Sequence, residues 1–336
     1  MKTQAGAVAA AAVMMAAALA APPVRADEVN VYTERQEVFL RDVFAGFTAA
    51  TGVKVNALYL ANGAIERLAS EGEHTVADVV IVADVGRLQE LEDRGLTQEI
   101  DAGVIGAAPH SDARQWVALT RRLRVLFVPQ DSPAAAEEMA GLAAARWRGG
   151  LCLRSGFHPY NVALFANYLG LHGEQEARAL IDGVKANLAR RPQGNDRAQI
   201  KGVASGQCKA AVANLYYYHK MLAGDDAAER KAAEAVRWLP LRMDAEGVHA
   251  NVSGGAIARH SKRPAAAARL LEYMLSAEAQ RIYAAANGEL PVRRDVAMPA
   301  ALQAAAALPV NGLPIGRIAS LRPAAAALVA EAAFDD

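Results

Sequence analysis

The sequence is poor in cysteine and in aromatic residues. Its 336 residues include only two cysteines, Cys152 and Cys208, and 6% are Phe, Trp or Tyr. Two isolated cysteines do not supply the ligands of a structural zinc site. The length predicts about two domains, and 53% hydrophobic residues allow each domain to bury a core, which excludes an intrinsically disordered chain.

The sequence also lacks an excess of charge of either sign, because 36 Lys and Arg stand against 36 Asp and Glu. It has no basic block with interleaved aromatics either, so nucleic-acid binding is excluded as an expected function. Beyond residue 26, no stretch is long and apolar enough to cross a bilayer.

The first 26 residues are typical of a secretory signal peptide. Lys2 supplies the positive start, Ala5 to Ala21 the apolar segment, and Val24-Arg25-Ala26 a small-x-small cleavage site. Cleavage after Ala26 is therefore expected. The alternative is an uncleaved anchor helix, which Pro22-Pro23 would break.

Short β-rich runs alternate with amphipathic helical segments, and this alternation predicts an α/β fold. The first unit has expected strands at 29–32, 53–60 and 77–84 and helices at 38–52, 64–72 and 85–95. An extended run at 116–128 follows, either as one long strand that crosses between lobes or as two strands broken near Arg121. A second unit has expected strands at 150–155 and 207–215 and helices at 161–173, 174–189 and 197–206. Two such lobes would form a ligand cleft at the carboxyl ends of their strands.

Three of the nine tyrosines stand in a row at 216–218, directly after the strand expected to end near Ala213. Consecutive side chains of a strand point to opposite faces, whereas in a helix they diverge by only about 100°. A strand-to-helix junction would therefore let Tyr216 and Tyr217 share one ligand. The alternative is an aromatic cluster that packs between the lobes.

A second loop, after the strand at 150–155, carries Ser155, Gly156 and Tyr160. Its hydroxyl and exposed amides could hold an anion near the start of the next helix; the alternative is a plain connection covered by Tyr160. Cys152 and Cys208 lie on the two strands that precede the tyrosine loops. Because export favours oxidised cysteines, we expect a disulfide between them.

Arg122 and Arg124 share one face of the extended run, because side chains alternate along a strand. A guanidinium group binds carboxylate, carbonate or phosphate through two hydrogen bonds, so the pair predicts an anion partner. A solvated edge strand is the alternative. The GxSxG, HExxH, CxxC, P-loop and GxGxxG patterns are absent, and a hydrolase using Ser155 or His158 would lack a matching base and acid.

Taken in order, these segments resemble the periplasmic ferric-ion-binding proteins of bacterial iron ABC transporters, a subgroup of the type II extracellular solute-binding proteins. The similarity covers nearly all of the mature chain and runs through VNVYTERQEVFLRDVFAGFTAATGVKVN, ADVVIVADVGRLQELEDRGLTQ, RWRGGLCLRSGFHPYNVALFANYL, RRPQGNDRAQIKGVASGQCKAAVANLYYY and HANVSGGAIARHS. It implies an α/β, two-lobed Venus-flytrap fold of type II with an interlobe cleft. We place the N-terminal lobe at 27–125 plus 250–300 and the C-terminal lobe at 126–249 plus 301–336.

The resemblance also implies one bound Fe³⁺, with phenolates of Tyr160, Tyr216 and Tyr217 as ligands and carbonate or phosphate as a synergistic anion. The anion-binding positions fall on Arg122, Arg124, Ser155, Gly156 and Asn214. Ferric iron is a hard cation that oxygen donors suit, and three phenolates would neutralise its charge.

This sequence departs from the family pattern in the first lobe. Gln36-Glu37 stands where many relatives have a His or a His-Tyr pair, and Ala83 replaces an acidic ligand. Glu37 is a possible additional ligand, although an anion at the remaining positions is the simpler hypothesis. The expected protein is a monomeric periplasmic carrier that delivers Fe³⁺ to an inner-membrane ABC permease and is not an enzyme; a bilobed receptor for another anion or small polar solute is the alternative.

Overall fold

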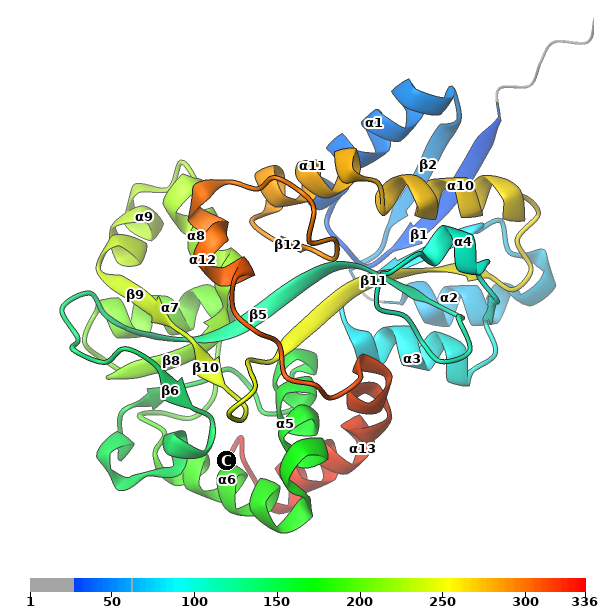
Figure 1. Ribbon diagram of the computed structural model, residues 1–336. Coiled ribbons are helices and arrows are strands. Elements are labelled where there is room, and N and C mark those ends of the chain that lie inside the picture. The colour runs from blue at the N-terminus through cyan, green and yellow to red at the C-terminus, as the bar shows by residue number, and fades with distance from the viewer. Residues whose placement is uncertain (1–26, 62) are drawn as a thin grey trace, which may run out of the picture.

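The computed structural model describes residues 27–61 and 63–336 as a two-lobed α/β protein (Figure 1). The expected signal peptide, residues 1–26, lies outside the described residues. None of the helices formed by the described residues has the length and apolarity that a membrane crossing requires. The two-lobed fold confirms the architecture expected from the sequence.

The first lobe is built on three parallel strands, each followed by a helix. The strands are β1 (Glu28–Thr33), β2 (Lys54–Tyr59) and β3 (Val79–Val82), and the helices are α1 (Arg41–Thr51), α2 (Ala64–Glu71) and α3 (Val85–Asp93). All four residues of β3 are buried, as its continuous apolar run predicts. Helix α1 ends at Gly52, whose φ of 72° favours glycine.

Two long antiparallel strands connect the lobes. Strand β5 (Val117–Pro129) pairs with β11 (Ala250–Ala258) as far as Leu123, and from Arg124 onward it pairs with strands of the second lobe. The extended run at 116–128 is thus one continuous strand without a break near Arg121. The resulting strand order is β2-β1-β3-β11-β5-β8-β7.

The second lobe carries the two tyrosine loops. Its strands are β7 (Leu151–Cys152), β8 (Ala210–Asn214) and β9 (Val236–Leu239), and its helices are α5 (Pro159–His172), α6 (Glu174–Ala186), α7 (Asp196–Ala204), α8 (Leu215–Ala223) and α9 (Ala227–Glu234). Strand β7 is shorter than the expected strand at 150–155, because pairing with β8 involves only Leu151 and Cys152. Cys152 and Cys208 form the predicted disulfide, with their Cα atoms 5.8 Å apart.

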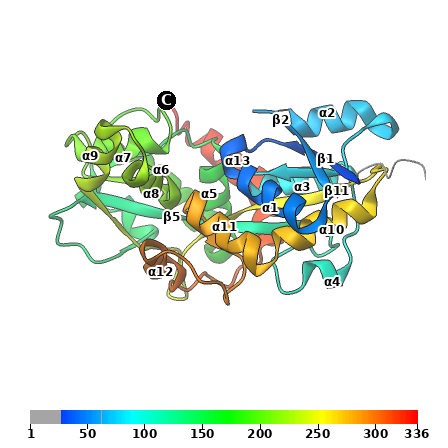
Figure 2. The same cartoon turned by 90° about the horizontal axis from the view of Figure 1, so that it is seen from above.

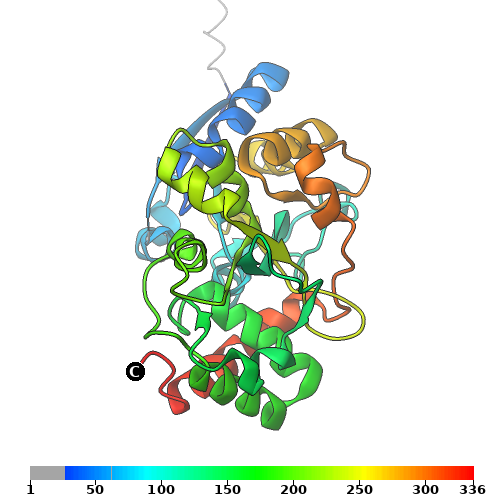
Figure 3. The ribbon, with the colours of Figure 1, turned by 90° about the vertical axis from the view of Figure 1, so that its left-hand side faces the viewer.

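The last part of the chain returns to both lobes. Helices α10 (Pro264–Met274) and α11 (Ala277–Asn287) pack beside α1 (Figure 2). Helix α13 (Ile315–Glu331) packs on α5, α6 and α3, and the C-terminal segment lies against the second lobe (Figure 3). The lobe boundaries given above remain a prediction.

The remaining elements are β4 (Thr97–Gln98), β6 (Glu137–Glu138), β10 (Leu241–Arg242), β12 (Leu290–Pro291), α4 (Ala102–Ile105), α12 (Ala300–Ala306) and 3-10 turns at Glu37–Phe39, Gly72–His74, Ala140–Ala143 and Ala145–Trp147.

Candidate metal centre

Tyr216 and Tyr217 lie in the first turn of a helix, as predicted for a shared ligand. Strand β8 ends at Asn214 and helix α8 starts at Leu215 without an intervening loop. The two phenol rings have centroids 4.1 Å apart and are tilted by 31°, so they lie against each other with their planes close to parallel. Tyr216 is buried and Tyr217 is half-buried.

Tyr160 lies in the first turn of α5, where the chain enters from the loop that follows β7. His158 caps this helix by accepting a hydrogen bond from the Tyr160 N–H at 3.2 Å. The phenol ring faces two guanidinium groups, with its centroid 5.0 Å from Cζ of Arg122 and 5.6 Å from Cζ of Arg154. Tyr160 therefore contacts two cationic side chains through the face of its ring.

Tyr160 is close enough to Tyr216 and Tyr217 to affect the ionisation of both. Burial, and after it the charge of Tyr160, raise the pKa of Tyr216 well above its usual value and the pKa of Tyr217 to about 12. Tyr216 and Tyr217 therefore hold their protons at neutral pH in the absence of a cation. A highly charged metal ion would reverse this preference, because it stabilises the phenolates that repel one another without it.

Arg122 lies on β5 beside Tyr160 and is buried. Its Nη2 donates to the carbonyl oxygens of Ala83 and Val252, and its Nε lies 4.0 Å from Glu289. That Nε has no hydrogen-bond partner among the described residues. Burial alone would lower the pKa of Arg122, but the negative charges of Tyr160 and Glu289 outweigh burial and raise it. Arg122 is therefore a permanent cation whose buried Nε is free to donate to a further group.

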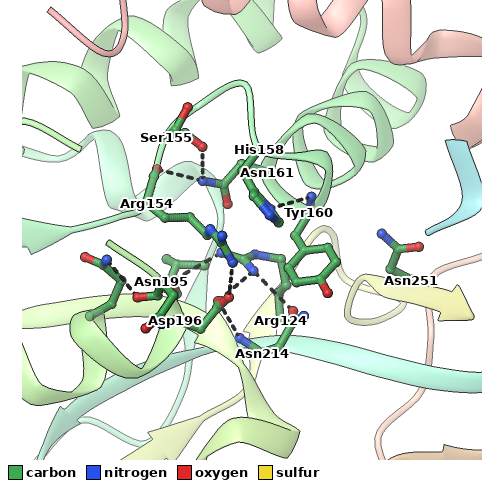
Figure 4. Close-up of polar contacts among 12 residues, drawn as sticks. Arg124, Arg154, Ser155, His158, Tyr160, Asn161, Asn195, Asp196, Asn214 and Asn251 are labelled. Carbon is green, nitrogen blue, oxygen red and sulfur yellow. Dashed lines mark hydrogen bonds and ion pairs between the residues drawn. The ribbon is translucent and has the colours of Figure 1, made fainter. Parts of the chain in front are cut away.

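Arg124 forms an ion pair with a carboxylate of the protein itself, that of Asp196. Its Nη1 lies 3.1 Å from Asp196 Oδ1 and 3.2 Å from Asn214 Oδ1, and Arg154 reaches the other oxygen of Asp196 at 2.6 Å (Figure 4). Asp196 and Arg124 are both fully buried. The predicted role of Arg124 in binding an external anion therefore finds no support in this geometry.

Ser155 and Gly156 are also occupied by a carboxylate of the protein. The Gly156 N–H donates to Asp335 Oδ1 at 2.7 Å, and the Ser155 hydroxyl donates to Asp335 Oδ2. The loop does hold an anionic group, as its donors predict, but that group belongs to the C-terminal segment. No local pattern indicated Asp335, because the two partners are 180 residues apart in sequence.

A cavity of about 660 Å³ opens between the lobes beside Tyr160. It is lined by Glu34, Ala61, Gly63, Glu66, Ala83, Asp84 and Arg87 from the first lobe and by His158, Pro159 and Tyr160 from the second. Glu37 is exposed in a 3-10 turn, where its charge affects Tyr59, and it does not line this cavity. The acidic residue after β1 that reaches the cavity is Glu34, which pairs with Arg87 and which the sequence analysis missed.

Among residues 27–61 and 63–336, no group of three or more His, Cys, Asp or Glu side chains could hold a metal ion. The three phenols beside Arg122 instead form a cluster whose oxygen donors would suit a hard cation. Two facing lobes, a cavity between them and ligand-type side chains at its edge define a solute-binding protein.

Comparison with known proteins agrees with this class. A family model described as "Bacterial extracellular solute-binding protein" matches residues 29–287. The chain belongs to this family, whose members are transport proteins and not enzymes.

Individual relatives are named for iron. The chain is 32% identical to "Iron uptake protein A2" of Synechocystis over 311 residues, which cover 90% of this chain and 89% of that protein. It is 27% identical to the "Major ferric iron-binding protein" of Neisseria meningitidis serogroup B, over 82% of this chain and 84% of the relative. Among solved structures, "Bordetella ferric binding protein" superposes with a TM-score of 0.87 at 36% identity, covering 92% of this chain and 100% of that one. A Trichodesmium protein "in complex with iron and citrate ligands" gives a TM-score of 0.87 at 29% identity, covering 91% and 99%.

Proposed function

We propose that this chain is the periplasmic solute-binding component of an ABC-type ferric iron importer. The observation that carries the proposal is the cluster of Tyr160, Tyr216 and Tyr217 at the starts of two helices, of which Tyr160 lines the interlobe cavity. Phenolate oxygens are hard donors that suit Fe³⁺, and the named relatives are iron-binding or iron-uptake proteins.

The ligand set leaves room for a synergistic anion, carbonate or phosphate. Two buried donors near the phenols, Nε of Arg122 and Nδ2 of Asn214, have no partner among the described residues. Buried donors without partners are costly, and an anion would satisfy them. Three phenolates would neutralise Fe³⁺, and Arg122 would offset the charge of the anion. Glu37 has no part in this ligand set.

Delivery would depend on motion about β5 and β11, which connect the lobes. Bending of these strands would bring the first lobe onto the loaded tyrosine cluster, and the closed monomer would be the form that an inner-membrane permease recognises. A receptor for another anion or small polar solute is the second candidate, because a cavity of about 660 Å³ also accommodates an organic anion beside the buried Arg122.

The test is addition of ferric nitrilotriacetate to the purified mature protein. We expect one iron per chain and a visible tyrosinate-to-iron absorption band. Tyr216→Phe or Tyr217→Phe should lose most of the iron affinity with little loss of stability, because each removes one donor oxygen and keeps the ring.

Tyr218→Phe is the matched control, since Tyr218 lies on the same helix and its ring packs against Phe127 at a centroid distance of 5.5 Å. The control should bind iron as the unchanged chain does. Absence of the visible absorption band, or unchanged iron affinity in both Tyr216→Phe and Tyr217→Phe, would contradict the proposal. The tyrosines would then have a packing role, and a receptor for another solute would be favoured.

A further inference from the structure

The C-terminal segment is held firmly against the loop that leads to Tyr160. Phe334 is fully buried, with its ring centroid 5.7 Å from that of Phe165. A Cβ atom at Gly156 would lie 2.7 Å from the Phe334 ring, so the close approach requires glycine at 156. Ala333 adopts a φ of 47°, a left-handed conformation that is strained for a non-glycine residue. Contacts made by the neighbouring residues must offset this strain.

Those contacts include hydrogen bonds from two cations. The Lys185 ammonium group donates to the carbonyl oxygen of Ala332 at 2.8 Å, and Nε of Arg191 donates to the backbone oxygen of Asp335 at 3.1 Å. These contacts fix the backbone around Asp335 and place its side chain beside the loop. There one carboxylate oxygen accepts a hydrogen bond from Ser155 and the other accepts one from Gly156.

Ser155 in turn organises the start of helix α5. Its backbone oxygen accepts hydrogen bonds from the His158 N–H at 3.1 Å and from Nδ2 of Asn161 at 3.0 Å. Its side-chain oxygen accepts from the Phe157 N–H at 3.2 Å. The Tyr160 N–H donates to Nδ1 of His158, so the position of Ser155 affects the backbone from which the Tyr160 phenol extends.

We propose that Asp335 is a positioning residue for Tyr160, and that its carboxylate takes the place of a bound anion at Ser155 and Gly156. This inference rests on the proposed function, in which Tyr160 is an iron ligand. The chain supplies its own anion at this loop, so an external anion is needed only near Arg122. Asp335 acts through Ser155 and Gly156 and does not touch the metal.

Iron affinity of Asp335→Ala, measured by competition with citrate, tests the first part. We expect a loss of about tenfold or more, because hydrogen bonds to charged groups are stronger than those between neutral groups and Asp335→Ala removes two of them. Asp336→Asn is the matched control, since this neighbouring carboxylate is exposed and lies 3.7 Å from Arg191 only. It should change affinity less than about twofold, a difference within the scatter of surface ion pairs.

A double-mutant comparison separates positioning from general damage. In the Tyr160→Phe protein, Asp335→Ala should cause no further loss of iron affinity, because the ligand that Asp335 positions is already absent. The same loss in both backgrounds, or no loss in either, would overturn the proposal. Chemical unfolding of each variant shows whether it is folded.

Hydrogen exchange of the iron-free protein gives a readout that does not depend on metal. In Asp335→Ala, amides of residues 154–161 should exchange faster than in the unchanged chain and in Asp336→Asn, whereas amides of α1 should not change. Unaltered exchange at 154–161 would overturn the positioning role. If the parent protein does not bind iron, the proposed function is wrong. The hydrogen-exchange result would still decide whether Asp335 orders the loop.

Discussion

Buried charge at the base of the tyrosine cluster is balanced residue by residue. Arg124, Arg154 and Asp196 form an ion-pair group in which Asp196 and Arg124 have no exposed side-chain surface. The Asn214 N–H also donates to Asp196 at 3.1 Å, so this carboxylate ties the two tyrosine loops together. A buried charge without its partner is costly, and the arrangement is therefore sensitive to loss of any one member.

Asp196→Asn should destabilise the protein by about 3–5 kcal/mol, because it leaves the Arg124 charge buried and uncompensated. Burial alone would raise the pKa of Asp196, but Arg124 and Arg154 hold it below its usual value. A lowered pKa contributes stability above the unfolded-state value of about 3.9, and this contribution is lost as pH falls through the folded-state value.

Urea unfolding at neutral pH, with Asp336→Asn as the exposed control, measures the first effect. Repeating the unfolding in acid measures the second, since the variant should lack this part of the acid sensitivity. A loss below about 1 kcal/mol, which is typical of a surface ion pair, would contradict the assignment.

At the scale of elements, local patterns predicted most strands and helices correctly. The alternation in 29–95 and the Gly52 helix end are decided by neighbouring residues, and so is the change from β8 to α8 that places two tyrosines in one helical turn. The predicted length of β7 was wrong, because only two residues of the 150–155 run pair with β8. Strand length depends on pairing across the sheet, which a single run does not reveal.

The disulfide links the two elements that lead to the tyrosine loops. Cys152 belongs to β7 and Cys208 precedes β8, and 56 residues separate them in sequence. Closing a loop of this length restricts the unfolded chain, which stabilises the folded state by about 4 kcal/mol in the chain-entropy model. Replacement of both cysteines by serine should therefore lower the free energy of unfolding by about 2–4 kcal/mol.

Guanidinium unfolding of the double variant measures this loss. Thiol titration of the unfolded, unreduced parent is the control and should find no free thiol among these cysteines. Unchanged stability would show that the crosslink contributes nothing to the folded lobe.

At the scale of the whole molecule, iron binding should couple to stability and to pH. A ligand that binds only the folded state at 1,000 times its Kd stabilises by roughly 4 kcal/mol. The pKa of Tyr217 is raised to about 12, so its phenol must lose a proton when iron binds. Because protons compete with the metal, affinity and the resulting stabilisation should fall as pH falls.

Thermal unfolding with and without ferric nitrilotriacetate, at about pH 7.5 and about pH 5.5, checks this expectation on either side of neutrality. The iron-free protein at each pH provides the baseline. Equal stabilisation at the two values would mean that no phenol loses a proton on binding, which is incompatible with phenolate ligands.

The sequence by itself determined the α/β alternation, the tyrosines at helix starts and the paired cysteines, because periodicity and helix-start signals act over a few residues. Only the tertiary structure decided which groups meet across long separations. In the folded protein Ser155 and Gly156 donate hydrogen bonds to Asp335. Arg124 pairs with Asp196. Glu34 lines the cavity, whereas Glu37 is exposed to solvent. A donor-rich loop has the same local pattern whether its anion comes from solution or from the far end of the chain. Whether the loop binds an external anion or a carboxylate of the protein depends on which side chains lie next to it in the folded chain.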